Sequence, residues 1–327
     1  MNKYTLAIET SCDDTSISIL EGIEVISLKT FSQIKDHQKF GGVIPEIASR
    51  LHSENIFKII NECIIDSGIS LKDIDRIAVT GGPGLVNTLQ VGITVAKTLA
   101  TLLNVPLYDI NHIEAHAYSP FINKKSKLIP KKAIVLIVSG GHTELLIKDK
   151  WNLELIGKTK DDSIGEAYDK VAKTLGYKYP GGPILDRIAS STSEDEIKAP
   201  IVRLEGYDFS YSGLKSHVLN KSKIKGNNKE GLIKGFQNAS INQIILKIQK
   251  AIDEYNIKNI IVGGGVSANS ALRNKLNEIE DVNVYIPKLM YTSDNAAMIG
   301  YLSVIKVINK KITSSKSNLD AEPRRSW

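Results

Sequence analysis

The chain has 327 residues, of which 42% are hydrophobic and 24% are charged, and its formal net charge is +6. These proportions are typical of a soluble globular protein, and the length favours two lobes over one. The two cysteines, Cys12 and Cys63, imply no disulfide framework, so we expect a cytoplasmic protein. No signal peptide opens the sequence, and no apolar run approaches the length of a membrane span. The mild positive charge permits nucleic acid as a partner but does not require it.

The first half of the sequence predicts a hairpin followed by a β–α–β unit. Residues 4–10 and 15–20 are predicted strands, and the polar residues 11–14 form the turn between them. Pro45 fits the first turn of a helix whose wide apolar surface packs in the core or meets a partner protein. The elements expected next are a strand at 74–80, a glycine turn at 81–84, a helix at 87–104 and a strand at 106–110. This succession is the repeating unit of a parallel α/β sheet.

The second half repeats this order of elements. They are a strand at 133–138, a turn at 140–141, strands at 143–147 and 257–262, glycines at 263–265, a helix at about 268–276 and a strand at about 282–286. The match indicates an internal duplication, with two related lobes facing each other across a cleft. We expect an N-terminal lobe of residues 1–108 plus about 299–327, and a C-terminal lobe of residues 109–298. Extra chain at about 161–245 carries aromatic, hydroxyl and lysine residues that suit a substrate-facing surface.

Two histidines, His112 and His116, directly follow the predicted strand at 106–110. On an α-helix this spacing places both imidazoles on one face, where they can share one divalent metal ion, although such pairs also arise by chance. Asn111 can cap this helix, and Glu114 can complete a capping box. A zinc protease would need its glutamate directly after the first histidine, whereas Glu114 is turned by about 200° around the helix. The spacing therefore argues against a protease.

The duplication predicts a third ligand for this ion. When residues 77–80 are aligned with residues 260–263, Asp294 takes the position in the second half that His112 takes in the first. Both residues then begin the helix after the second strand, His112 and His116 in one lobe and Asp294 in the other. Two histidines and one carboxylate leave coordination positions open for a substrate. Alternatively, Asp294 is only a first-turn carboxylate that the helix dipole favours.

Three glycine turns follow predicted strands, at 81–82, 140–141 and 263–265. Glycine lets a bound group approach the backbone, and free N–H groups there suit phosphate. Hairpins with polar tips in both lobes and a glycine turn before a helix are arranged as in actin-like ATPases and sugar kinases, a likeness of fold alone. The predicted fold class is therefore α/β, of the ASKHA type, with two duplicated RNase H-like lobes.

Six stretches together resemble one family, TsaD/Gcp, the bacterial and organellar relatives of the Kae-type proteins. They are residues 9–15, 37–52, 112–116, 138–143, 263–269 and 293–295. The resemblance implies a metal-dependent acyltransferase that moves threonylcarbamoyl from threonylcarbamoyl-adenylate to N6 of the adenosine 3′ of the anticodon in tRNAs reading ANN codons (t6A formation), with release of AMP. It also implies one divalent ion, with Fe2+ (iron) first and Zn2+ second, held by His112, His116 and Asp294.

The resemblance implies partners and further site residues as well. The partners are tRNA, a metal-less TsaB-like paralogue that docks on the helix after Pro45, and a small TsaE-like ATPase, with no membrane involved. The positions that match those holding the adenylate are Ser139, Gly140, Gly141, Asp169, Gly182, Asp186 and Asn269. Glu9 and His142 are both candidates for a catalytic base that removes the amine proton, and the sequence does not choose between them.

Two other functions stay open at this point. An ASKHA-type ATPase or kinase needs a catalytic carboxylate and magnesium, but no histidine pair. A non-catalytic scaffold paralogue would lack the three metal ligands. Lysine runs at 124–132 and 221–229 are either tRNA contacts or solvated faces. The last ten residues, which end in Arg324, Arg325, Ser326 and Trp327, are expected to be frayed.

Overall fold

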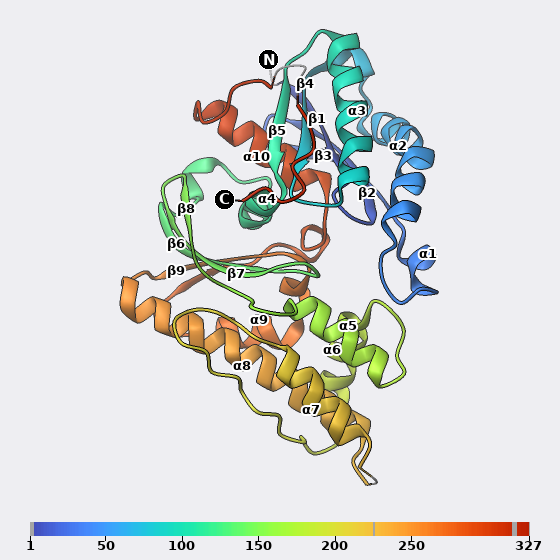
Figure 1. Cartoon of the computed structure of the whole chain (residues 1–327). Coiled ribbons are helices and arrows are strands. Elements are labelled where there is room, and N and C mark those ends of the chain that lie inside the picture. The colour runs from blue at the N-terminus through green and yellow to red at the C-terminus, as the bar shows by residue number, and fades with distance from the viewer. Residues whose placement is uncertain (1–2, 225, 316–318, 327) are drawn as a thin grey trace. The chain divides into compact units, whose positions relative to one another are not determined.

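A computed structural model of the chain describes residues 3–224, 226–315 and 319–326 (Figure 1). The chain forms two compact units: unit 1 is Met1–Ile129 with Ser293–Trp327, and unit 2 is Pro130–Thr292. These boundaries differ from the predicted ones at 108/109 and 298/299. Residues 109–129 belong to unit 1 because β5 (Leu107–Asn111) pairs with β4 (Ile74–Gly82) in its sheet, and helix α4 (His112–Tyr118) continues directly from β5.

Each unit is built on one five-stranded sheet, and the two sheets have the same topology. The strand orders are β3-β2-β1-β4-β5 and β10-β9-β6-β7-β8, so that counted from its own start each sheet runs third, second, first, fourth, fifth. In both, the first three strands are antiparallel and the last two are parallel to the first. The remaining strands are β1 (Tyr4–Glu9), β2 (Asp14–Glu21), β3 (Glu24–Ser32), β6 (Lys132–Val138), β7 (Thr143–Asp149), β8 (Asn152–Lys158), β9 (Asn259–Gly263) and β10 (Asn283–Tyr285). The predicted duplication and the α/β fold class are confirmed.

The edge strands β3 and β8 were not predicted from the sequence. Both carry polar residues between their apolar ones, and several positions of each are exposed. An edge strand of this kind pairs through its backbone on one side only, so its side-chain pattern is weak. The two hairpins are therefore three-stranded meanders.

Helices cover both faces of the sheet in unit 1. Figure 1 shows α2 (Pro45–Ser67) and α3 (Val86–Leu103) on one side and α10 (Ala296–Ile308) on the other. Leu6 and Ile8 of β1 face the core beneath α2 and α3. Ala7 faces α10, where a Cβ added to Gly300 would lie 3.1 Å from the Ala7 Cβ. The alternation along β1 thus buries both faces of the strand. The short helices of unit 1 are α1 (Ile34–Gln38), Leu71–Asp73, Ser119–Phe121 and Ser126–Leu128.

Helix α3 corrects the expectation that no apolar run reaches the length of a membrane span. It is long and apolar enough to cross a membrane by length and composition alone, and 44% of that window is buried inside the structure. The helix packs against β4 and α2. A core helix passes the same test of length and hydropathy, and its packing identifies α3 as one.

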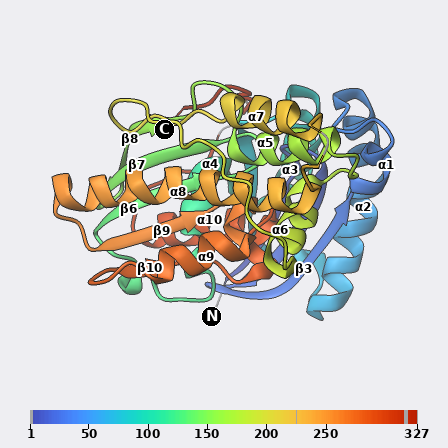
Figure 2. The same cartoon turned by 90° about the horizontal axis from the view of Figure 1, so that it is seen from below.

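In unit 2 the helices gather on one face of the sheet (Figures 1 and 2). They are α5 (Ile164–Thr174), α6 (Gly181–Ser191), α7 (Ser212–Ser222), α8 (Lys229–Tyr255) and α9 (Ser270–Asn277), with short helices at Gly265–Ala268 and Leu289–Tyr291. The predicted extra chain at about 161–245 contains α5 to α7 and the start of α8. It supplies much of the core of unit 2, including the rings of Tyr168 and Phe236, whose centroids are 4.9 Å apart.

Candidate metal centre and substrate residues

Helix α4 begins with the predicted cap. The Oδ1 atom of Asn111 accepts hydrogen bonds from the backbone N–H groups of Ile113 and Glu114, at 2.9 and 3.0 Å. The predicted capping box has a different second half, because the Glu114 carboxylate forms an ion pair with Lys306 of α10. Glu114 therefore faces α10, and its use in that ion pair agrees with the argument against a protease.

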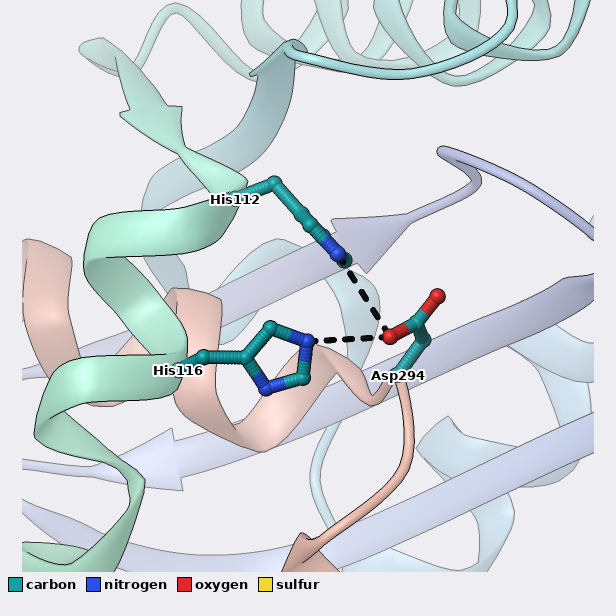
Figure 3. Close-up of side chains that lie close together, drawn as sticks. All are labelled: His112, His116 and Asp294. Atoms are coloured by element: carbon teal, nitrogen blue, oxygen red, sulfur yellow. Dashed lines mark hydrogen bonds and ion pairs between the residues drawn. The ribbon is translucent and has the colours of Figure 1, made fainter. Parts of the chain in front are cut away.

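His112, His116 and Asp294 come together within unit 1, as Figure 3 shows. Oδ1 of Asp294 lies 3.0 Å from Nε2 of His116 and 3.4 Å from Nε2 of His112. The expectation that Asp294 comes from the other lobe is wrong. The chain leaves unit 2 at Thr292, and Asp294 lies directly before α10, which packs on the sheet of unit 1.

The spacing of these three donor atoms fits one divalent metal ion. Bonds of about 2.1 Å from such an ion to nitrogen and oxygen separate two ligand atoms by about 3.0 Å at a right angle and about 3.4 Å at the tetrahedral angle. Both histidine side chains are buried, whereas that of Asp294 is 25% exposed. Three ligands with an accessible carboxylate leave coordination positions for a substrate, as a catalytic site requires.

Glu9 holds the ring of His112 from the opposite side. Its Oε2 atom lies 3.0 Å from Nδ1 of His112, and Ser11 Oγ lies 3.2 Å from the same nitrogen. Because an ionised carboxylate only accepts hydrogen bonds, Nδ1 carries the proton, and Nε2 is left to face Asp294. The Glu9 carboxylate is fully buried and also accepts from Ser11 N at 2.6 Å and from the hydroxyl of Thr80. These contacts support a role for Glu9 in orienting a metal ligand.

The electrostatics of the site favour a cation. Burial alone would lower the pKa of His112, but the carboxylates of Glu9 and Asp294 raise it to about 10. Burial lowers the pKa of His116. Burial alone would raise the pKa of Asp294, yet His112 and His116 hold it well below its ordinary value. The metal-free site therefore holds a proton on His112 between two carboxylates, in the place where a divalent ion would supply the positive charge.

The residues predicted to bind the adenylate all lie in unit 2, together with His142. The turn between β6 and β7 is closed by Ser139, whose Oγ accepts hydrogen bonds from the N–H groups of Gly141 at 3.3 Å and His142 at 3.1 Å. The hydroxyl of Ser163, the N-cap of α5, donates to the carbonyl of Gly140. The turn therefore rests on the N-terminus of α5, where backbone N–H groups favour anions.

The other predicted residues join α5, α6 and α9. Asp169 of α5 accepts from the N–H of Gly181, the first residue of α6, at 2.6 Å. Asp186 of α6 accepts from both the N–H and the hydroxyl of Ser270, at 2.9 and 2.8 Å, so its two oxygens hold the start of α9. Asn269 caps α9 by accepting from Leu272 N at 2.9 Å, and its amide nitrogen donates to Gln237 at 3.1 Å.

Sequence reasoning missed Ser163, Ser270 and Gln237, which support these residues. Ser163 could have been found, because a serine three residues before Glu166 has the spacing of a capping box. Ser270 and Gln237 have no local signal. Each acts through a contact with a residue at least 32 positions away in the sequence.

Comparisons with known proteins identify the family. Residues 24–301 match the family model TsaD, described as tRNA N6-adenosine threonylcarbamoyltransferase. The enzymes of that name from Staphylococcus aureus strains bovine RF122 / ET3-1 and JH9 are each 45% identical over 307 residues, covering 90% of this chain and 89% of theirs. The predicted family and the predicted transferase activity are confirmed.

Solved structures show the fold alone. HypF from T. kodakarensis superposes with a TM-score of 0.61 at 15% identity, over 96% of this chain and 48% of HypF. Full-length HypF in its phosphate- and nucleotide-bound form superposes with a TM-score of 0.63 at 15% identity, over 96% of this chain and 56% of HypF. Both agree with an ASKHA-like fold, and the chain itself belongs to the TsaD family of tRNA N6-adenosine threonylcarbamoyltransferases.

Proposed function

We propose that this chain takes threonylcarbamoyl from threonylcarbamoyl-adenylate and transfers it to N6 of the adenosine 3′ of the anticodon in tRNAs reading ANN codons. The N6–carbonyl carbon bond forms, the bond from that carbon to the AMP phosphate oxygen breaks, AMP leaves, and N6 gives up a proton. One observation in the structure carries the metal-dependent form of this proposal. It is the meeting of His112, His116 and Asp294 around one point.

We assign one divalent ion to these three ligands. Two imidazoles and one carboxylate with open positions suit Fe2+, our first choice, and Zn2+ as the alternative. When bound, such an ion supplies Lewis-acid chemistry toward the acyl group or the phosphate of the donor. Glu9 keeps Nε2 of His112 aimed at the ion, and the pair of buried histidines keeps water from that side.

In this proposal the adenylate lies against the glycine positions of unit 2. A Cβ added to Gly140, Gly141, Gly182 or Gly265 would meet nothing within 4 Å among the residues that the structure describes. None of these glycines has a positive φ. Neither packing nor backbone conformation therefore accounts for glycine here, and close approach of a ligand does. The N–H groups of Gly140 and Gly141 would then stabilise negative charge on the donor.

The polar residues of unit 2 have supporting roles in this scheme. Asp169, Asp186 and Asn269 use their side chains to hold the starts of α6 and α9, and so shape the place for the AMP part of the donor. His142 is our candidate for the base that accepts the N6 proton. We assign Glu9 to the orientation of His112, because it is fully buried and both its oxygens have partners.

We also propose the partners and the cellular location. tRNA is the acceptor, and a TsaB-like paralogue without metal ligands docks on α2, which exposes the rings and chains of Phe57 (61%) and Ile65 (70%). A TsaE-like ATPase completes the system, which we place in the cytoplasm.

The test is to incubate the purified protein with synthetic threonylcarbamoyl-adenylate, unmodified tRNA and the two partners, with and without a chelator. We expect the modified nucleoside to form only without chelator, and to return when Fe2+ is restored. Formation that chelator leaves unchanged would refute the metal's role. ATP hydrolysis without any modified nucleoside would support the ATPase alternative, and neither product, with partners competent beside a known enzyme, would support the scaffold.

A further inference from the structure

The C-terminal residues 319–326 lie along the glycine turn that follows β4. The N–H of Glu322 donates to the carbonyl of Gly81 at 2.8 Å, and the N–H of Gly84 donates to the carbonyl of Pro323 at 3.3 Å. Leu319 packs against the core of unit 1. The expectation that the last ten residues are frayed is therefore wrong for 319–326, while Asn318 and Trp327 lie outside the described residues.

This contact explains two glycines that the sequence had suggested as a phosphate turn. A Cβ added to Gly82 would lie 2.0 Å from the carbonyl oxygen of Glu322. A Cβ added to Gly81 would lie 2.1 Å from Oδ1 of Asp109 and 3.1 Å from Nη1 of Arg325. Both positions must be glycine for the C-terminal residues to lie where they do.

Two further links run from this segment to the start of the metal-binding helix. Nη1 of Arg325 donates to Oδ1 of Asp109 in β5 at 2.6 Å, and both side chains are mostly buried. Nδ2 of Asn111 donates to the carbonyl of Ser326 at 3.2 Å. The other amide atom of Asn111, Oδ1, caps α4, and the next residue is His112.

The side-chain amide of Asn111 therefore has a defined orientation. With Nδ2 held by Ser326, Oδ1 must face the first N–H groups of α4, since the two atoms are on opposite sides of one planar group. Asp109, two residues before Asn111, is held by Arg325 in the same way. The segment thus restrains the β5–α4 corner from which His112 projects.

We propose that residues 319–326 are a positioning segment for the metal site, acting through Arg325 on Asp109 and through Ser326 on Asn111. This inference rests on the proposed metal site. Metal ligands depend on the residues that orient them, and loss of such support typically costs about 10- to 100-fold in metal affinity. The C-terminal segment acts one contact further away, so we expect the lower end of that range.

The experiment compares Arg325→Ala with Arg324→Ala, a matched control because Arg324 carries the same charge one residue earlier and is exposed. The first readout is the Kd for Co2+, followed by its visible absorption. Arg325→Ala should weaken binding about tenfold, and Arg324→Ala less than about twofold. A chain ending at Pro323 should behave like Arg325→Ala. Arg325→Lys, which keeps a cation beside Asp109, should recover part of the affinity.

The second readout is hydrogen exchange over residues 111–118 in the metal-free protein. Exchange at Ile113 and Glu114 should be faster in Arg325→Ala than in Arg324→Ala, with melting curves showing that both are folded. Equal Co2+ affinity and equal exchange in the two variants would overturn the proposal. An unfolded Arg325→Ala would shift the comparison to Arg325→Lys, where unchanged affinity and exchange relative to Arg324→Ala would also overturn it.

The outcomes also separate this inference from the proposed function. If the unaltered protein binds no Co2+, the metal site itself fails, and the exchange measurement alone still tests the segment. If both arginine variants raise the KM for tRNA equally with Co2+ affinity unchanged, the segment is a basic tRNA contact and the positioning role is refuted. A lower kcat with unchanged KM for tRNA, in Arg325→Ala only, is the expected result.

Discussion

The carboxylate of Glu9 lies 3.0 Å from Nδ1 of His112, although 103 positions separate the two residues in the sequence. Glu9→Gln keeps the shape of the side chain but removes the charge that fixes the tautomer and orientation of His112. We expect metal affinity to fall by about 10- to 100-fold, the usual cost of losing a carboxylate behind a histidine ligand. Competition with a chelator of known affinity measures this directly.

Glu114→Gln is the matched control, because Glu114 lies on the same side of the sequence as the histidines but pairs with Lys306. It should leave metal affinity nearly unchanged. If Glu9→Gln instead binds metal normally and loses only kcat, Glu9 is the general base that the sequence also allowed. His142 would then lose its place as the candidate.

Removal of the two histidine ligands should abolish tRNA modification. His112→Ala with His116→Ala leaves only the carboxylate of Asp294, which is too few ligands to retain the ion. We expect no metal in the purified variant and no modified nucleoside, with a far-ultraviolet circular dichroism spectrum like that of the unaltered protein. Full modification activity in this variant would contradict the metal site.

Metal binding should release a proton. In the metal-free protein the pKa of His112 is raised from 6.5 to about 10, so this imidazole is protonated at pH 7.5 and must lose its proton to bind an ion. Affinity should therefore rise with pH up to about 10. Calorimetric titration in two buffers of different ionisation enthalpy counts the proton, and equal heats in both buffers would contradict the prediction.

The same shift has a consequence for the stability of the metal-free protein. Because the pKa of folded His112 lies above its unfolded value of 6.5, its contribution is fully present below that pH and is lost as the pH rises through about 10. Chemical denaturation between pH 6 and 10 should show this decline. In His112→Ala the decline should be smaller.

Two glycines of unit 2 should respond to alanine in opposite ways. Gly182→Ala meets open space among the described residues, so stability should change by no more than about 0.5 kcal/mol, while the KM for the adenylate rises. Gly165→Ala would place a Cβ 2.6 Å from the carbonyl oxygen of Ser139 and should destabilise the protein by about 1–3 kcal/mol. Thermal melts and steady-state kinetics measure both, and an unchanged KM in Gly182→Ala would refute a ligand at that position.

The sequence by itself determined the features that depend on short-range spacing. The pair of histidines on one helical face, the Asn111 cap, the repeated order of strands and the family motifs are all local patterns, and the structure or the comparisons bear them out. A helix cap or a turn uses neighbours in the chain, so its signal can be found in a few residues.

Only the tertiary structure decided which distant residues meet. It brought Asp294 into the same unit as the histidines, set Glu9 behind His112, and laid the C-terminal residues on Gly81 and Gly82. It also added the edge strands β3 and β8, whose side-chain patterns are weak. Such contacts arise from the packing of whole elements, α10 on its sheet above all, and no spacing within one segment encodes them.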